Sequence, residues 1–187
     1  MLLTRDDLPR LKAVMDHARP LSVAQVSVLH DVVTHVYLTG LPYEKTDGGF
    51  IGMRPVRSDA FTELPCVIVE TRLIGFAAYR SLLDGDVIQS IEERPDLELD
   101  SPSKFIGDIG PRKPGTVVHL IVLRQGRQMR IAITLDARPA ELPAMAATVE
   151  EVDRMLKDFN DARLKIAEEY WQKEFSRLVI DAVSQAQ

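Results

Sequence analysis

The fold is decided by the stretch Leu82-Leu83-Asp84-Gly85-Asp86-Val87-Ile88-Gln89-Ser90-Ile91. It lies in a segment, from about Gly48 to Arg138, that is punctuated by Gly and Pro and carries several short β-branched runs. Short runs between such breakers are typical of strands joined by turns. The segments before and after show the three-four spacing of helices. We therefore predict a chain of three parts: helical, strand-rich and helical.

The first part is predicted to hold two helices. Asp6 or Asp7 can cap a short helix that is stopped by Pro20. Ser22 then opens a second helix, and Gly40 suits its C-terminal cap. The apolar positions of this second helix are spaced at three and four: Val23, Val26, Leu29, Val33 and Val36.

The sequence pattern predicts two neighbouring strands in the middle part. Residues 117–123 are apolar on both faces, and Arg124-Gln125-Gly126-Arg127 supplies a hairpin turn that contains Gly. Within residues 129–135 the apolar Met129, Ile131, Ile133 and Leu135 alternate with other residues, which is the period of a half-buried strand. A strand that is apolar on both sides is covered on both sides. We therefore expect a flanking helical segment to lie over this sheet and to contact His119.

The last part, from Pro143 onward, has no further Gly or Pro and predicts a long helix. A helix of about 40 residues would extend about 60 Å, which is longer than a small domain is wide. Either it breaks near Asn160-Asp161, or part of it packs on another chain as a homodimer, or it folds back on the second N-terminal helix. Its apolar stripe comprises Val149, Val152, Leu156, Phe159, Ile166 and Tyr170, continued with a phase shift by Trp171, Phe175, Leu178 and Ala182.

Composition and charge limit the classes of protein to which the chain can belong. The chain has 187 residues, of which 45% are hydrophobic and 27% charged, as in ordinary globular proteins. A net charge of −5 argues against a nucleic-acid partner. Because no apolar run approaches about 18 residues, we expect no membrane insertion. The first residues reach Asp6 and Asp7 too early for a signal peptide, so we expect a soluble chain, cytoplasmic unless an upstream export signal is missing.

The residue types that could act in catalysis or bind a metal are explained more simply by structural roles. Ser101-Pro102-Ser103-Lys104 matches a nucleophile pattern, but it lacks the partner motifs and Ser101 more naturally caps a helix. His30 and His35 are splayed around one helix and do not converge on a metal. The single cysteine, Cys66, permits no internal disulfide and suits a small core residue. We expect no enzyme activity, no cofactor and no metal.

Three motifs occur in a fixed order along the middle segment. They are Gly49-Phe50-Ile51-Gly52-Met53, the stretch 82–91 quoted above, and Lys113-Pro114-Gly115-Thr116 followed by a strand, a Gly turn and a second strand. Together they resemble a PDZ domain, of the bacterial kind attached to HtrA-type proteases. The resemblance covers about half of the chain. It implies that the first motif is a carboxylate-binding loop and that the second ends one short helix and starts the next strand.

The loop has a physical logic of its own. A Gly between two apolar residues lets the N–H groups of Ile51, Gly52 and Met53 turn toward one point, and such a nest attracts a carboxylate. The following residues, through Val56, offer a strand edge on which an extended peptide can add. Pro55 has no N–H, so pairing beyond Arg54 is limited.

The resemblance implies that a short helix, near Ser101 to Gly110, forms the other wall of a groove. Phe105 and Ile109 would face the core. Ile106 with the loop would make an apolar pocket, which suits a peptide C-terminus whose last residue is aliphatic or small and apolar. The peptide-binding residues predicted are Phe50, Ile51, Gly52, Met53, Arg54, Ser103, Ile106 and Gly110.

The sequence thus predicts an α+β fold: a PDZ-like, partly open β-barrel or sandwich with two short helices, flanked by N-terminal helices and a long C-terminal helix or helical hairpin. The predicted domains are an N-terminal helical segment (1–47), a PDZ-like domain (48–138) and a C-terminal helical extension (139–187). The predicted function is non-catalytic recognition of a peptide or protein. Two alternatives stay open: a structural, self-associating protein with a vestigial groove, and the PDZ portion of a larger protease.

Overall fold

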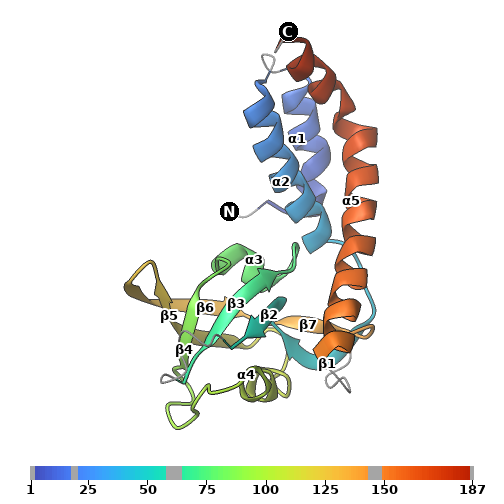
Figure 1. Ribbon diagram of the computed structural model, residues 1–187. Helices are drawn as coiled ribbons and strands as arrows, with labels where there is room; N and C mark the ends of the chain where they lie inside the picture. Colours follow the sequence, from blue (N-terminus) through green and yellow to red (C-terminus); the bar gives the residue numbers. More distant parts are fainter. Residues whose placement is uncertain (1–2, 18–20, 58–64, 143–148, 186–187) are drawn as a thin grey trace. The chain divides into compact units, whose positions relative to one another are not determined.

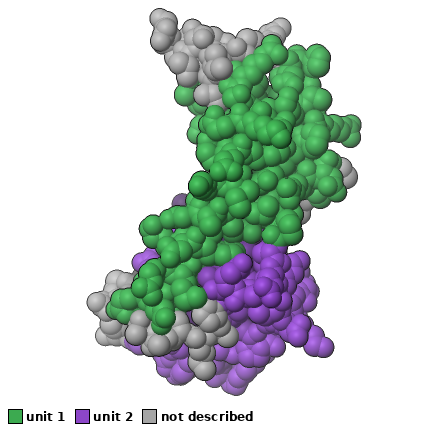
Figure 2. All heavy atoms as spheres, turned by 90° about the vertical axis from the view of Figure 1, so that its right-hand side faces the viewer, with its two compact units in different colours: residues 1–42, 150–187 green, residues 43–149 purple. Residues whose placement is uncertain are grey.

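Two compact units make up the chain in the computed structural model, which describes residues 3–17, 21–57, 65–142 and 149–185. One unit joins residues 1–42 to residues 150–187, and the other comprises residues 43–149 (Figure 2). The helical unit therefore brings together the two ends of the sequence, and the mixed unit holds all the strands. The domain boundaries predicted at 47/48 and 138/139 stay predictions.

The helical unit contains a 3-10 turn, η1 (Arg5–Asp7), and three α-helices, α1 (Leu8–Met15), α2 (Val23–Thr39) and α5 (Val149–Gln185), which lie side by side (Figure 1). Ser22 caps α2 as predicted, because its hydroxyl accepts from the Gln25 N–H and its own N–H donates to the Gln25 side chain. Asp7, one of the two predicted residues, is the N-cap residue of α1, but its side chain makes no cap bond there and instead accepts from the N–H of Thr4, the N-cap of η1. Among the described helices, none combines the length and the apolar character that a transmembrane segment requires.

The long C-terminal helix is continuous, so no break occurs near Asn160-Asp161. Its apolar residues Ala167, Trp171, Phe175 and Leu178 are buried within the helical unit. The Trp171 ring meets His30 of α2 edge to face at 4.9 Å, and Tyr170 stacks on Tyr37 at 4.3 Å. These contacts show α5 packed on α2, which was one of the alternatives for its apolar stripe.

The mixed unit contains two sheets, both antiparallel. A two-stranded sheet pairs β1 (Lys45–Phe50) with β7 (Asp136–Pro139). An open five-stranded sheet has the order β2-β3-β4-β5-β6. Its strands are β2 (Met53–Val56), β3 (Val67–Arg72), β4 (Val87–Ile91), β5 (Val117–Arg124) and β6 (Arg127–Thr134), with two short helices, α3 (Ala77–Ser81) and α4 (Pro102–Ile109), between them in sequence. Strands β2 and β6 are the edges of this sheet, and the α+β fold class is confirmed.

Local chemistry fixes the turns that the sequence predicted. Gln125 and Gly126 both have positive φ, 50° and 77°, as a two-residue hairpin turn requires. In the stretch 82–91, Gly85 takes a φ of 88°, and the buried Asp86 carboxylate accepts the Leu83 N–H at 2.8 Å. Arg124 also donates to Asp86, at 2.6 and 2.8 Å, which ties the hairpin to this turn.

One apolar core fills the mixed unit. It is formed by residues from β2 to β6, both short helices and the loop after β1. Its largest fully buried side chains include Leu82, Ile88, Ile91, Leu99, Leu120 and Ile133. The strand alternation is confirmed at Ile133 and Leu135, whereas Met129 is 40% exposed because it lies close to the hairpin turn on an edge strand. On the outer face of β5, His119 bonds with Glu93 of the same unit rather than with a helix.

Candidate peptide-binding groove

The two elements predicted to flank a groove are an edge strand and a helix that run in opposite directions. Strand β2 is hydrogen-bonded to β3 on one side only. Before the loop that leads into β2, the N–H of Gly49 on β1 donates to the carbonyl of Gly110, the C-cap of α4, at 3.0 Å. At the end of β2, Arg57 donates to the carbonyl of Asp100, just before α4, at 2.8 Å. The two bonds hold β2 and α4 antiparallel and leave the free edge of β2 as a site for an added strand.

The loop between β1 and β2 turns its carbonyls into the protein. The Ile51 carbonyl accepts from Ala78 at 2.8 Å, and the Gly52 carbonyl accepts from Leu73 at 2.8 Å. Both loop residues are buried, yet no hydrogen bond among the described residues uses the N–H of Ile51 or of Gly52 as its donor. Buried N–H groups are nearly always paired, so two neighbouring donors of this kind form a candidate anion site.

Gly52 is required in this loop for two reasons. Its φ is 79°, in the left-handed region that side chains avoid. A Cβ at this position would also lie 2.2 Å from the Phe76 Cβ. Phe76 in turn meets Phe50 edge to face at 5.1 Å, so the half-buried Phe50 supports the turn from the other side.

Helix α4 turns toward the core the two residues that were predicted to face it. Ser101 caps it by accepting the Lys104 N–H, and Phe105 and Ile109 are buried in the core. One flank is tied by Asp108 to Arg94 and Arg112, at 3.1 and 2.6 Å. The other flank carries the half-buried Ile106 and Gly110, and Ser103 is exposed.

The predicted apolar pocket has its loop residues deeper than expected. Ile51 and Met53 are 3% and 6% exposed and belong to the core, whereas Ile106 is half-buried. Arg54 pairs with Glu70 of β3, and the pairing of β2 with β3 shifts register between Arg54 and Pro55. The expected limit that Pro55 places on pairing with an added peptide concerns the other edge of β2 and stays a prediction.

Sequence reasoning missed Arg138, which lies close to the loop. It is buried on β7, and its Nη2 would be 3.0 Å from a Cβ at Gly110, with its Nε 3.7 Å from a Cβ at Gly48. The absence of a side chain at Gly110 therefore makes room for the guanidinium, whereas the distance at Gly48 is an ordinary contact. Burial lowers the pKa of Arg138. The sequence around Gly48 does not indicate that Arg138 lies nearby, because the pairing of β1 with β7 joins residues about 90 positions apart in sequence.

Within the described residues, the predicted nucleophile candidates lie in structural surroundings. The Lys104 ammonium donates to Asp100 at 2.6 Å, while the Ser101 hydroxyl serves as a helix cap. Burial raises the pKa of the Cys66 thiol, and the opposing charge of Arg57 is the weaker influence. A thiol with a raised pKa is a poor nucleophile at neutral pH.

One cluster has the residue types of a metal site. The ligand atoms of Glu92, Glu93 and His119 lie within 4.8 Å of one another on the surface. These groups already have partners, because Arg130 donates to Glu92 at 2.6 Å and His119 lies 2.6 Å from Glu93. The cluster is accounted for as an exposed ion-pair network.

No family model and no curated protein matches this chain. Solved structures give a partial likeness. A variant of the HtrA-type protease AlgW with a decapeptide has a TM-score of 0.45 and 23% identity, over 51% of this chain and 31% of that chain. AlgW with a tripeptide has a TM-score of 0.44 and 22% identity, over 49% and 32% of the two chains. The serine endoprotease from Yersinia pestis has a TM-score of 0.40 and 21% identity, over 49% and 29%. The chain thus spans about a third of the length of these proteases.

Proposed function

We propose that the mixed unit is a non-catalytic module that binds the C-terminus of a peptide or protein in the groove between β2 and α4. The observation that carries this proposal is the pair of buried N–H donors, Ile51 and Gly52, at the end of an open strand edge. A terminal carboxylate satisfies both donors, and the chain that precedes it pairs with the edge.

The direction of the ligand follows from the direction of the groove. A peptide that adds antiparallel to β2 places its last residue beside Met53, where β2 begins, next to the loop donors. Its last side chain then lies over Ile51 and Met53 and against Ile106, which favours an aliphatic or small apolar residue. The register shift at Pro55 limits the pairing to the first residues of β2, so recognition is concentrated on the last few residues of the ligand.

A binding role without catalysis is consistent with the chemistry of the candidate nucleophiles. The carboxylate beside Ser101 is Asp100, whose pKa is lowered chiefly by the hydrogen bond from Lys104, which makes it a weak base, and burial keeps the Cys66 thiol protonated. We expect bound peptides to be recovered intact by mass spectrometry after prolonged incubation. Cleavage that disappears in Ser101→Ala or Cys66→Ala would contradict the non-catalytic assignment.

Calorimetry on matched peptides tests the proposal. Peptides that end in valine, leucine or alanine are prepared as free acids and as amides. We expect the acids to bind with a Kd on the order of 1 µM, about −8 kcal/mol. The amides should bind at least tenfold more weakly, because they lose a charge-assisted hydrogen bond. Equal affinity of acid and amide, or no binding across a diverse peptide library, would contradict it.

A pair of variants localises the binding. Ile106→Glu places a charge on the helix wall of the groove and should abolish binding while the unit stays folded. Val117→Glu is the matched control, since it makes a similar change at an exposed residue of β5, in a strand that does not line the groove. Loss of binding in both variants, or in neither, would show that the groove is not the site.

A further inference from the structure

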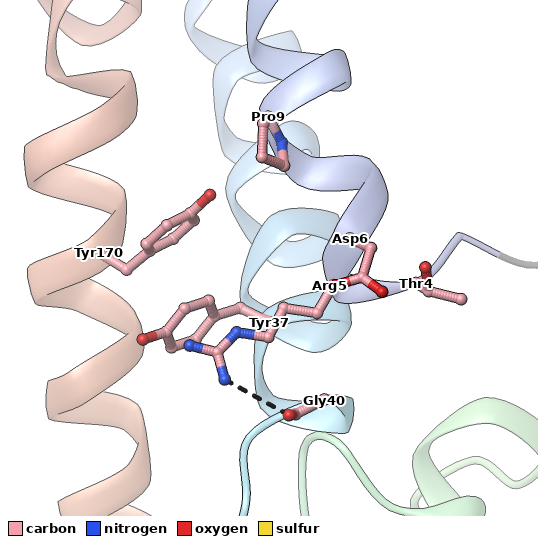
Figure 3. A pocket seen from close by; sticks show the side chains of 7 residues that line it. All are labelled: Thr4, Arg5, Asp6, Pro9, Tyr37, Gly40 and Tyr170. Atoms are coloured by element: carbon pink, nitrogen blue, oxygen red, sulfur yellow. Dashed lines mark hydrogen bonds between the residues drawn. The ribbon is translucent and has the colours of Figure 1, made fainter.

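The helical unit contains a hollow of its own, independent of the groove. It has a volume of about 640 Å³ and is lined by residues of η1, α1, α2 and α5, among them Arg5, Pro9, Tyr37 and Tyr170 (Figure 3). A volume of this size is in the range of small-molecule sites. No sequence motif indicated a ligand site at these residues.

Arg5 is held in place at this hollow by three contacts. Its guanidinium lies over the Tyr37 ring, 4.4 Å from the centroid, and its Nη1 donates to the Gly40 carbonyl at 3.4 Å (Figure 3). Its aliphatic stem crosses the bare Cα of Gly40, where a Cβ would lie 2.6 Å from the Arg5 Cβ. Gly40 has a φ of −90°, so contact with Arg5, and not a left-handed cap, explains the glycine.

The positive charge of Arg5 is not neutralised by the part of the chain that the structure describes. No carboxylate among the described residues comes within ion-pair distance of its guanidinium. Only one of its five N–H donors has a protein acceptor among these residues, at the long distance given above. A fixed guanidinium with free donors is suited to a planar oxyanion such as a carboxylate.

The remaining walls favour a flat, singly charged ligand. Tyr37 and Tyr170 stack at 4.3 Å with an interplanar angle of 17°, and Pro9 adds a further apolar surface. Burial raises the pKa of the Tyr170 phenol, which therefore stays neutral and able to donate a hydrogen bond. Asp6 also lines the hollow, and its charge disfavours a second negative charge on the ligand.

We propose that this hollow binds a small planar organic acid with a single negative charge, whose carboxylate pairs with Arg5 and whose ring lies against the tyrosines. The site is distinct from the peptide groove, because every residue that lines it belongs to the helical unit.

NMR titration of the full chain with benzoate, benzamide and phenyl phosphate tests the proposal. We expect benzoate to shift the Tyr37 and Gly40 amides and to bind at least tenfold more tightly than benzamide, which has the same shape without the charge. Phenyl phosphate, which carries up to two negative charges, should bind more weakly than benzoate. Equal binding of benzoate and benzamide would overturn the proposal, and stronger binding of phenyl phosphate would overturn the preference for a single charge.

Three variants distinguish a specific role of Arg5 in binding benzoate from the effect of positive charge on the surrounding surface. Arg5→Gln should weaken benzoate binding at least tenfold, because it removes the charge-assisted hydrogen bond. Arg10→Gln removes an exposed positive charge from neighbouring α1 and should leave binding unchanged. Gly40→Ala keeps the charge but displaces the Arg5 stem, so it should also weaken binding. If Arg5→Gln and Arg10→Gln behave alike while both retain the helical circular dichroism of the parent chain, the assignment to Arg5 is wrong.

Discussion

Replacing Gly52 with alanine should damage the mixed unit more than the same change at any other turn glycine with open surroundings. The left-handed conformation costs an alanine about 1–2 kcal/mol. The new Cβ would also lie 2.2 Å from the Phe76 Cβ and 2.8 Å from its Cγ, and forcing such a group into a packed core costs about 1–3 kcal/mol. The two effects together predict a loss of about 2–5 kcal/mol in the free energy of unfolding.

Gly85→Ala is the matched control for this prediction. Gly85 has a φ of 88°, but a Cβ there would meet nothing within 4 Å, so the loss should be only about 1–2 kcal/mol. Amide hydrogen exchange of β4 and β5 measures both losses in the mixed unit. Fluorescence of Trp171, the single tryptophan, follows the helical unit as a reference. Equal losses in the two variants would refute the reasoning that contact with Phe76 fixes this loop.

Three further predictions concern α4 and α5. Gly107→Ala should stabilise the mixed unit by about 1 kcal/mol, because this helical glycine has open space where the Cβ would go; unchanged hydrogen exchange would count against it. Hydrogen bonds from Gln172 and His30 lower the pKa of Glu168 in the folded protein. These bonds therefore stabilise the fold above the pKa of an unfolded glutamate, about 4.3, and their contribution is lost as the pH falls through the lower pKa of the folded state. Glu168→Gln should therefore reduce the loss of unfolding free energy at acid pH, as measured by tryptophan fluorescence. The same loss in the variant and the parent chain would contradict this. A homodimer through α5 would use Ile166, which is 42% exposed. Light scattering should then give the mass of a dimer for the parent chain and of a monomer for Ile166→Glu. A monomeric parent chain would exclude this homodimer.

Features set by neighbouring residues could be predicted from the sequence. The Ser22 cap, the turn at Gln125-Gly126 and the Gly85-Asp86 turn each depend on a few adjacent side chains. The core-facing residues of α4 followed from the resemblance to PDZ domains, and Phe105 and Ile109 are buried as it implies. The antiparallel strands that these turns join could therefore be anticipated with their approximate bounds.

Features that depend on distant pairing could not be predicted. The position of Arg138 beside Gly48 follows from the pairing of β1 with β7. The apolar stripe of α5 fitted an interface between chains as well as a core, and only the contacts with α2 show that Trp171 and Phe175 are internal. Gly40 is the C-cap of α2 as predicted, but its contact with the stem of Arg5, 35 residues away in sequence, could not be foreseen.

The central claim, that a terminal carboxylate occupies the loop between β1 and β2, is tested most directly by an NMR titration that follows the amide protons of Ile51 and Gly52. A short peptide with a free apolar C-terminus should move both resonances downfield, as new hydrogen bonds to a carboxylate require, and should perturb β2 and α4 with them. The amide form of the same peptide should leave the two resonances nearly in place. Binding that shifts other regions while the Ile51 and Gly52 amides stay fixed would contradict the account.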